Sequence, residues 1–207
     1  MIAIIDYDAG NIRSVEKAVS SLGYEAKVSR DKSEILSADH VILPGVGSFG
    51  DAMEKLKKYD LIEVIRKVAE NGTPFLGICL GLQLLYEESE ETPGVEGLCL
   101  LKGRCLRFDA DKGLKIPQIG WNSLELINDG RLFKGIDDGA YVYFVHSFYV
   151  KAEEESTVKA LCRYANTAHA SVESGNIFAC QFHPEKSGSV GLKILENFLK
   201  IGKEDLC

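Results

Sequence analysis

The sequence predicts an α/β fold with an open, mostly parallel sheet flanked by helices. In the first half of the chain, short apolar runs alternate with segments whose apolar residues recur at helical spacing, an alternation typical of βαβ units. The second half carries several short strand-like runs separated by turns, which predicts added antiparallel strands. With 207 residues, 45% of them hydrophobic, the chain is long enough to bury a core without disulfides. We expect a single domain over residues 1–207.

The first half is expected to hold four strands and the helices between them. Ile2–Ile5 is a run of apolar residues, as in a strand buried on both faces. Helical periodicity begins at Ile12 and stops at Gly23, a residue favoured just after helices. The later elements are a strand at 24–28, a short helix at 31–37, a strand at 40–43, one or two helices at 53–68, a strand at 73–79 and a helix at 80–86.

The second half is expected to extend the sheet with antiparallel strands or to form a small second sheet. Apolar spacing towards the end of the chain predicts a final amphipathic helix over 190–199. Two acidic runs, 87–91 and 153–155, are expected to be solvated surface. The predicted strands lie at 98–101, 104–108, 123–127, 141–150, 157–164, 168–173 and 177–182, with turn residues between them.

Charge and cysteine usage exclude several classes of protein. The chain has 24 basic and 31 acidic residues, a net charge of −7, whereas a general nucleic-acid binder would show a basic excess. The six cysteines are scattered without a CxxC pair or zinc-ligand spacing, so we expect neither metal nor cofactor. The start lacks the basic region of a signal peptide, and the longest apolar stretch is too short to span a membrane. We expect a cytoplasmic protein with reduced thiols and with no nucleic-acid or membrane partner.

Residues 77–81, Gly-Ile-Cys-Leu-Gly, carry the strongest chemical signal. They match the nucleophile-elbow pattern, with cysteine in place of serine, at a predicted strand-to-helix turn. The two glycines leave room for neighbouring backbone where a Cβ would clash. A helix N-terminus favours the thiolate form of Cys79. A buried structural cysteine is the alternative, but the glycines and the turn favour a nucleophile.

A thiol nucleophile needs a base and a group that orients the base. His183 follows a predicted strand and lies two residues before Glu185, whose carboxylate could accept the imidazole N–H. Together with Cys79 these residues would form a Cys–His–Glu triad, and a surface turn is the alternative. We expect His40 to be structural and His169 to lie at the surface, whereas His146 fits either the core or the wall of a binding site.

The segment 44–47, Pro-Gly-Val-Gly, follows the third predicted strand and could supply backbone N–H groups to an oxyanion hole. The amide of Leu80 would be the second donor. Open α/β sheets bind their ligands at the carboxyl ends of the strands, where both segments are expected. A sharp turn is the alternative, and the segment lacks the Gly-Lys-Ser/Thr ending of a phosphate loop.

Five segments together resemble the class I, triad-type glutamine amidotransferases. The resemblance covers essentially the whole chain and implies the flavodoxin-like fold of that family. The PGVG, GWN and FVHS segments are most similar to the glutaminase subunits of imidazole glycerol phosphate synthase. The five segments are PGVGSFGDAM at 44–53, GICLGLQLL at 77–85, IGWN at 119–122, YFVHSFYV at 143–150 and QFHPEKS at 181–187.

The resemblance implies a role for each matching residue. Cys79 would attack the side-chain amide of glutamine. His183 would take the thiol proton and pass one to the leaving ammonia, while Glu185 orients His183. Water would then hydrolyse a γ-glutamyl thioester to glutamate. The residues implied to bind the substrate or to form the oxyanion hole are Val46, Gly47, Leu80, Gln83, Ser147 and Phe148.

The resemblance also implies a partner. In this family, ammonia passes to a separate cyclase subunit with a TIM-barrel fold, which makes imidazole glycerol phosphate and AICAR in histidine biosynthesis. This chain has no phosphate loop and is too short for such a barrel. IGWN and the aromatic strand at 141–149 fit either a docking face or the core, and we expect Trp121 to be packed.

Val46 stands where many of these relatives carry glycine. A β-branched side chain restricts the backbone. We hypothesise that the oxyanion hole of the free subunit is misaligned until a ligand of the partner realigns it.

Three other functions fit parts of the same pattern. A stand-alone cysteine γ-glutamyl hydrolase or peptidase would need no partner. A non-enzymatic subunit would have a degenerate site, which the intact Cys79, His183 and Glu185 argue against. An amidotransferase subunit of the anthranilate, aminodeoxychorismate, guanylate or cytidylate type is the third alternative.

Overall fold

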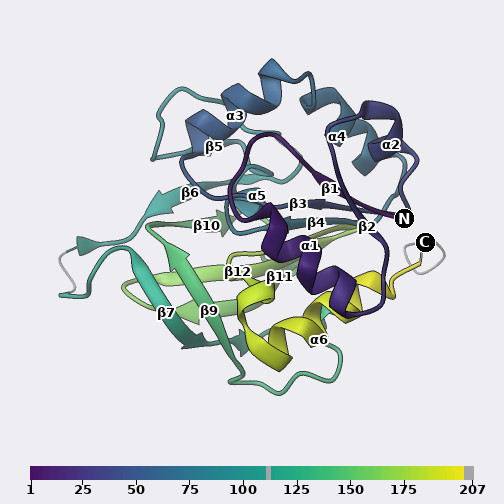
Figure 1. Cartoon of the computed structure of the whole chain (residues 1–207). Helices are drawn as coiled ribbons and strands as arrows, with labels where there is room; N and C mark the ends of the chain where they lie inside the picture. Colours follow the sequence, from purple (N-terminus) through teal and green to yellow (C-terminus); the bar gives the residue numbers. More distant parts are fainter. Residues whose placement is uncertain (111–112, 203–207) are drawn as a thin grey trace.

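A computed structural model describes residues 1–110 and 113–202, and Figure 1 shows its central sheet between two layers of helices. The strands of the main sheet are β1 (Ile2–Ile5), β2 (Ala26–Ser29), β3 (His40–Leu43), β4 (Phe75–Ile78), β8 (Glu125–Leu126), β11 (Val158–Arg163), β12 (Thr167–Ser174) and β13 (Ile177–Cys180). Their order is β2-β1-β3-β4-β13-β12-β11-β8. The part β2-β1-β3-β4-β13 is parallel, and β12, β11 and β8 add antiparallel pairs. The expected mostly parallel sheet, with a flavodoxin-like strand order, is confirmed.

Both faces of the parallel sheet are buried, because side chains from one strand alternate between two cores. In β1, Ala3 and Ile5 belong to one core, and Ile2 and Ile4 belong to the other. This double burial explains why the strands read as continuous apolar runs. Helices α2 (Lys32–Leu36), α3 (Phe49–Lys58) and α4 (Ile62–Glu70) cover the first core, and α1 (Ile12–Ser21) and α6 (Gly188–Leu199) cover the second (Figure 1).

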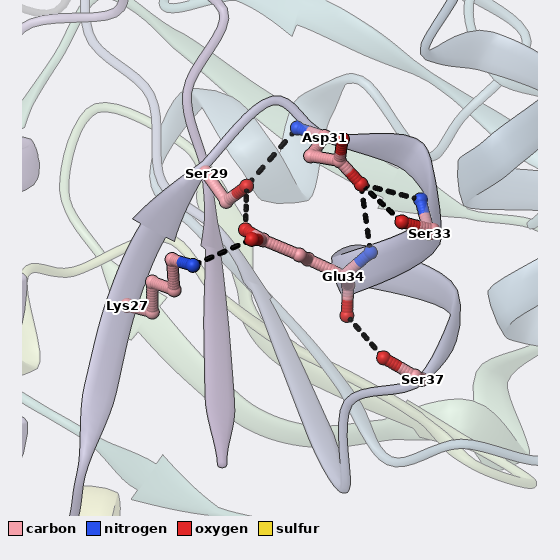
Figure 2. A network of polar contacts seen from close by, with 6 residues as sticks. All are labelled: Lys27, Ser29, Asp31, Ser33, Glu34 and Ser37. Atoms are coloured by element: carbon pink, nitrogen blue, oxygen red, sulfur yellow. Dashed lines mark hydrogen bonds and ion pairs between the residues drawn. The ribbon is translucent and has the colours of Figure 1, made fainter.

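The short helix α2 is held by the capping network that Figure 2 shows. Asp31 is its N-cap, and the carboxylate accepts hydrogen bonds from the backbone N–H groups of Ser33 (2.8 Å) and Glu34 (3.0 Å). The Glu34 carboxylate accepts hydrogen bonds from Ser29 Oγ (2.6 Å) and Lys27 Nζ (2.5 Å), both in β2. Since a helix of five residues is marginal by itself, these contacts stabilise α2 and tie it to the sheet.

Two smaller sheets lie beside the main one. β5 (Glu88–Ser89), β6 (Gly103–Arg107) and β10 (Phe148–Ala152) form one of them. In the other, β7 (Gln118–Ser123) pairs with β9 (Tyr141–His146). Short 3₁₀ helices lie at Arg131–Phe133, Glu155–Thr157 and Pro184–Lys186.

Three strand predictions in the second half need correction. The run 141–150 is two strands, because β9 pairs with β7 while β10 pairs with β6, and between them the Ser147 carbonyl accepts a hydrogen bond from the Phe108 N–H. β13 is not an antiparallel addition to the sheet, since it lies parallel to β4. β7 was not predicted, because Gly120 and Asn122 interrupt its apolar pattern.

The helix predicted at 80–86 spans only α5 (Leu80–Gln83), and residues 98–101 form no strand. The two errors share a cause. The N–H groups of Leu98 and Leu100 donate to the carbonyls of Leu84 (2.8 Å) and Leu85 (2.9 Å). The segment after residue 97 therefore takes the acceptors that a longer helix would use.

The acidic run at 87–91 is only partly the solvated surface that we expected, because Glu88 and Glu90 are exposed but Ser89 is buried, whereas the whole of 153–155 is exposed. Glu88 and Ser89 form β5, and the neighbouring carboxylates accept hydrogen bonds from backbone N–H groups of other segments. The bonds join Glu87 to Gly103 (3.1 Å), Glu90 to Arg107 (2.8 Å) and Glu91 to Phe49 (2.7 Å).

We expected Trp121 to be packed, but it is 56% exposed. It lies in β7, opposite Tyr143 of β9. Ile119 and Tyr141, on the same ribbon, are 63% and 60% exposed. Because side chains two residues apart share one face of a strand, these residues form one outward surface, which we call the aromatic face (Ile119, Trp121, Tyr141 and Tyr143).

Candidate active site

Cys79 and His183 lie together at the carboxyl edge of the parallel sheet. Cys79 follows β4 directly, and His183 lies just beyond the end of β13. The two strands are neighbours, with Ile78 opposite Cys180, and the Cys79 N–H donates to the Cys180 carbonyl at 2.8 Å. Parallel pairing of β4 and β13 therefore brings the two residues together from distant parts of the chain.

The turn at Cys79 has the strained backbone of a nucleophile elbow, with φ 55° and ψ −107°. A Cβ at Gly81 would lie 1.9 Å from the carbonyl oxygen of Leu43. A Cβ at Gly77 would lie 2.8 Å from the carbonyl oxygen of Gly81. The close backbone approach that we predicted for both glycines is therefore present.

His183 and Glu185 form a buried pair. The distance between His183 Nδ1 and Glu185 Oε1 is 2.8 Å, and both side chains are almost fully buried. The same carboxylate oxygen accepts a hydrogen bond from Asn11 Nδ2 at 2.5 Å. Because the carboxylate is an acceptor, Nδ1 carries the hydrogen, and Nε2 is the ring atom left for Cys79.

The protonation of His183 depends on its two partners in the triad. Burial lowers the pKa of His183, but its interactions with Cys79 and Glu185 outweigh burial and raise the pKa to about 9. His183 Nε2 is buried without a hydrogen-bond partner among the described residues. The Cys79 thiol lies 3.9 Å from the carbonyl oxygen of Val145. Nε2 is therefore the ring atom that would receive the thiol proton.

A cavity of about 410 Å³ opens above Cys79. Every residue that the resemblance implied for the substrate or the oxyanion hole lines it: Val46, Gly47, Leu80, Gln83, Ser147 and Phe148. His183 and Glu185 are not among the lining residues. His146, for which we left open the core or the wall of a binding site, also lines the cavity, and the lining residues that were not predicted are Glu91, Pro117, Val145 and Lys186.

The loop at 44–47 is held against the elbow. The Tyr7 hydroxyl donates to the Pro44 carbonyl at 2.8 Å. A Cβ at Gly45 would lie 2.9 Å from Leu80 Cβ, so the loop packs directly on the residue after the nucleophile. Gly47 has φ 101°, which favours glycine, and Val46 is 37% exposed beside the cavity. This places the backbone of the loop and of Leu80 on one side of Cys79.

The remaining histidines have structural contacts. His40 Nε2 lies 2.9 Å from the Ile201 carbonyl, as expected of a structural residue. His169 is half-buried rather than at the surface, and its Nδ1 accepts a hydrogen bond from the Ala152 N–H. His146 is buried in the cavity wall, where burial lowers its pKa to about 4.

Some of the missed residues had a signal in the sequence. Gln181 lies two residues before His183, and strand alternation would place both side chains on one side. Glu91 had no such signal in the sequence, because its place in the cavity depends on how the chain turns back after α5. In residues 1–110 and 113–202, no cluster of three or more His, Cys, Asp or Glu is arranged to hold a metal. No helix in these ranges is both long enough and apolar enough to cross a membrane.

Comparison with known proteins agrees with this geometry. Residues 3–201 match the family Glutamine amidotransferase class-I. The imidazole glycerol phosphate synthase subunit HisH of Caldanaerobacter subterraneus subsp. tengcongensis is 51% identical, over 96% of this chain and 97% of that protein. The same subunit of Methanocaldococcus jannaschii is 47% identical, over 97% and 100%.

Solved structures share the fold. A crystal structure of a glutamine amidotransferase has a TM-score of 0.75 at 22% identity and covers 97% of this chain and 98% of that one. The structure of PurLQS from Thermotoga maritima has a TM-score of 0.74 at 24% identity, over 96% of both chains. With the family match and the similarity to the HisH subunits, the chain belongs to the class I glutamine amidotransferases and, within them, to the HisH subunits of imidazole glycerol phosphate synthase.

Proposed function

We propose that the protein hydrolyses glutamine to glutamate and ammonia through a thioester on Cys79, and that a cyclase partner consumes the ammonia. The observation that carries the proposal is the elbow cysteine at the floor of a cavity, beside a buried His183–Glu185 pair. The similarity to HisH subunits over nearly the whole chain supports the choice of reaction. We take residues 1–207 as one amidotransferase domain, which the family match over 3–201 supports.

In the first half-reaction, the Cys79 proton moves to His183 Nε2 and the sulfur attacks the side-chain amide carbon of glutamine. The Glu185 carboxylate accepts a hydrogen bond from the Nδ1–H group and stabilises the imidazolium. The oxyanion accepts hydrogen bonds from the backbone N–H groups of Leu80 and of Gly47, the residue after Val46. His183 then protonates the amide nitrogen, the C–N bond breaks, and ammonia leaves a γ-glutamyl thioester.

In the second half-reaction, water attacks the thioester. His183 Nε2 takes one proton from the water, the new C–O bond forms, and the C–S bond breaks. The proton returns to the sulfur of Cys79. The new carboxylic acid loses the second proton of the water to solvent, glutamate leaves with a carboxylate in place of the amide, and the enzyme is regenerated.

The cavity wall offers groups for the α-amino and α-carboxylate ends of glutamine. Both hydrogens of the Gln83 amide are used, by the carbonyl of Phe148 (3.0 Å) and by Gln181 Oε1 (3.1 Å). The Gln83 oxygen is therefore the atom left for the substrate, and an oxygen suits the α-ammonium group. The carboxylate of Glu91 suits the same group. The backbone at Ser147 and Phe148 is our candidate contact for the α-carboxylate.

The aromatic face is our candidate docking surface for the cyclase, a TIM-barrel subunit that makes imidazole glycerol phosphate and AICAR in histidine biosynthesis. Pro117, which directly precedes β7, and Val145 and His146 at the end of β9 also line the cavity. Lys186, in the cavity wall, has its Nζ 5.9 Å from the ring centre of Tyr143. A partner on this face would therefore cover the mouth of the site. The five described cysteines are free, which supports a reducing compartment, and we propose the cytoplasm.

The test is co-purification with a cyclase, followed by glutaminase assays with and without the cyclase and its nucleotide ligand. We expect complex formation and a glutaminase rate that depends on the partner and its ligand. A Cys79→Ala variant should form the complex but release no ammonia. High activity of the free chain, with no gain from the partner, would favour a stand-alone γ-glutamyl hydrolase instead.

A further inference from the structure

A buried side-chain amide reaches the sulfur of Cys79 from the segment that carries His183. Gln181 is fully buried, and its Nε2 lies 3.6 Å from Cys79 Sγ, at the distance of an N–H···S hydrogen bond. Its Oε1 accepts the hydrogen bond from Gln83 Nε2 at 3.1 Å. The contact with Cys79 has no part in the mechanism proposed above.

The carbonyl of Phe148 fixes the orientation of both amides. Gln83 Nε2 must face it, because a flipped Gln83 would place an oxygen 3.0 Å from another acceptor. With Nε2 of Gln83 so placed, the Gln181 oxygen must face Gln83, since the reverse orientation would oppose two donors. The NH₂ group of Gln181 therefore points at the sulfur.

Three of the titratable groups near the sulfur carry no charge. Burial leaves Tyr7, Cys180 and His146 uncharged at neutral pH, because it raises the pKa of Tyr7 and of Cys180 and lowers that of His146 to about 4. α5 is a single turn and adds only a weak dipole field. The titratable groups that face the site are Tyr7 after β1, Cys180 in β13, His183 and Glu185 beyond β13, and Glu91, His146 and Lys186 in the cavity wall.

We propose that Gln181 is a further catalytic residue, whose amide N–H donates to the sulfur of Cys79 and stabilises the thiolate that attacks glutamine. The hydrogen stays on the amide nitrogen, while the thiol proton goes to His183. The proposal rests on the glutaminase function. A hydrogen bond to a charged group shifts an equilibrium by about tenfold or more. Loss of the N–H should therefore raise the pH at which Cys79 becomes reactive by about one unit.

The test is Gln181→Met, which keeps the length of the side chain and removes the donor. In the full chain, alkylation of Cys79 by iodoacetamide is followed by mass spectrometry of the Cys79 peptide, from about pH 5 to about pH 10. We expect the midpoint of the rate profile to rise by about one unit and the rate at neutral pH to fall about tenfold. Gln181→Asn, whose amide is one methylene shorter, should shift the midpoint in the same direction.

The chain offers a matched control. Gln118 is also a buried glutamine, and its Nε2 also lies 3.6 Å from a cysteine sulfur, that of Cys162. Gln118→Met should leave the alkylation midpoint of Cys79 unchanged. A midpoint that is the same in Gln181→Met and in the unaltered chain, with both folded by circular dichroism, would overturn the proposal. Failure of the glutaminase function itself would show separately, as an unaltered complex that releases no ammonia.

Discussion

Asn11 lies outside the Cys–His–Glu triad and donates a hydrogen bond to the Glu185 carboxylate. It has φ 68°, a conformation that asparagine and glycine adopt readily. Asn11→Gly therefore removes the hydrogen bond without straining the backbone. Since a hydrogen bond to a charged group contributes roughly 1.5 kcal/mol or more, we expect kcat of the complex to fall about tenfold with little change in KM. Steady-state glutaminase kinetics of the complex measure both constants.

Two further variants complete this experiment. Asn11→Asp keeps the backbone conformation but sets a second carboxylate against Glu185, so its loss of kcat should exceed that of Asn11→Gly. Ser20→Ala changes an exposed residue at the other end of α1 and should have no effect. An unaltered kcat in Asn11→Gly would show that Glu185 needs no second partner.

His146 should make the folded state sensitive to acid. Its pKa in the folded protein is lowered to about 4 by burial, whereas an unfolded chain retains a value near 6.5. Between these values the unfolded chain binds a proton that the folded chain does not, so stability is present above about pH 6.5 and is lost as pH falls. From pH 7 to pH 4.5 the loss due to His146 should be about 2 kcal/mol.

Urea unfolding at these two pH values, for the unaltered chain and for His146→Asn, measures that loss. The variant is expected to be less stable at pH 7, because it loses the contacts of the ring with Phe148 and Gln118. Its stability should nevertheless fall by about 2 kcal/mol less on acidification. His40 and His169 are present in both chains, so their contributions to the loss of stability cancel in the comparison. Equal losses in the two chains would assign the acid sensitivity to other groups.

The short sequence patterns around Cys79 and His183 predicted the local structure of the site, because neighbouring residues determine that structure. Close backbone contacts at Gly77 and Gly81 can be read from spacing alone. The positions of Asn11 and Glu91 could not be predicted in this way. They depend on which strands are neighbours and on how the chain folds back after α5, and no short sequence window contains that information.

At the scale of elements, we propose that the loop between β3 and α3 controls whether the oxyanion hole is formed. The side chain of Val46 packs on the β1–α1 loop, since a Cβ at Gly10 would lie 2.8 Å from Val46 Cγ2. Val46→Gly would remove both this contact and the restriction of a β-branched residue. If misalignment stores roughly 1.4 kcal/mol, glutaminase activity of the free chain should rise about tenfold.

The assay is ammonia release without the cyclase, compared with the complex. Val46→Ala keeps a Cβ and should give a smaller gain than Val46→Gly. Unchanged activity of the free Val46→Gly chain would refute the hypothesis of a misaligned hole. Equal thermal unfolding midpoints would show that the gain does not come from a loosened fold.

The elements of the first half were predicted well because β1, β3 and β4 are buried on both faces and each helix has one apolar face. The second half was predicted less well because its strands belong to three different sheets. Apolar runs at 141–150 and 177–182 look alike in sequence, yet one divides between two small sheets and the other joins the parallel core. Pairing partners, rather than strand propensity, separate these outcomes.

At the scale of the whole molecule, the small size of the chain is informative. One α/β layer structure houses the hydrolysis of glutamine, but the chain carries no phosphate loop for the cyclase reaction. The aromatic face exposes Ile119, Trp121 and Tyr141 beside the cavity, and a docking function would explain this exposure. Exposed aromatic residues in one patch are typical of a protein interface.

Trp121 should be the main anchor of the cyclase on this face. It is 56% exposed, and its ring centre lies 6.2 Å from that of Tyr143. Trp121→Ala should weaken complex formation by roughly 2 kcal/mol or more, which is about a thirtyfold rise in Kd. Isothermal titration of the cyclase into each chain measures Kd. Arg66→Ala, in α4 of the helix layer remote from β7 (Figure 1), is the control and should bind normally. Equal affinities for Trp121→Ala and the unaltered chain would place the docking surface elsewhere.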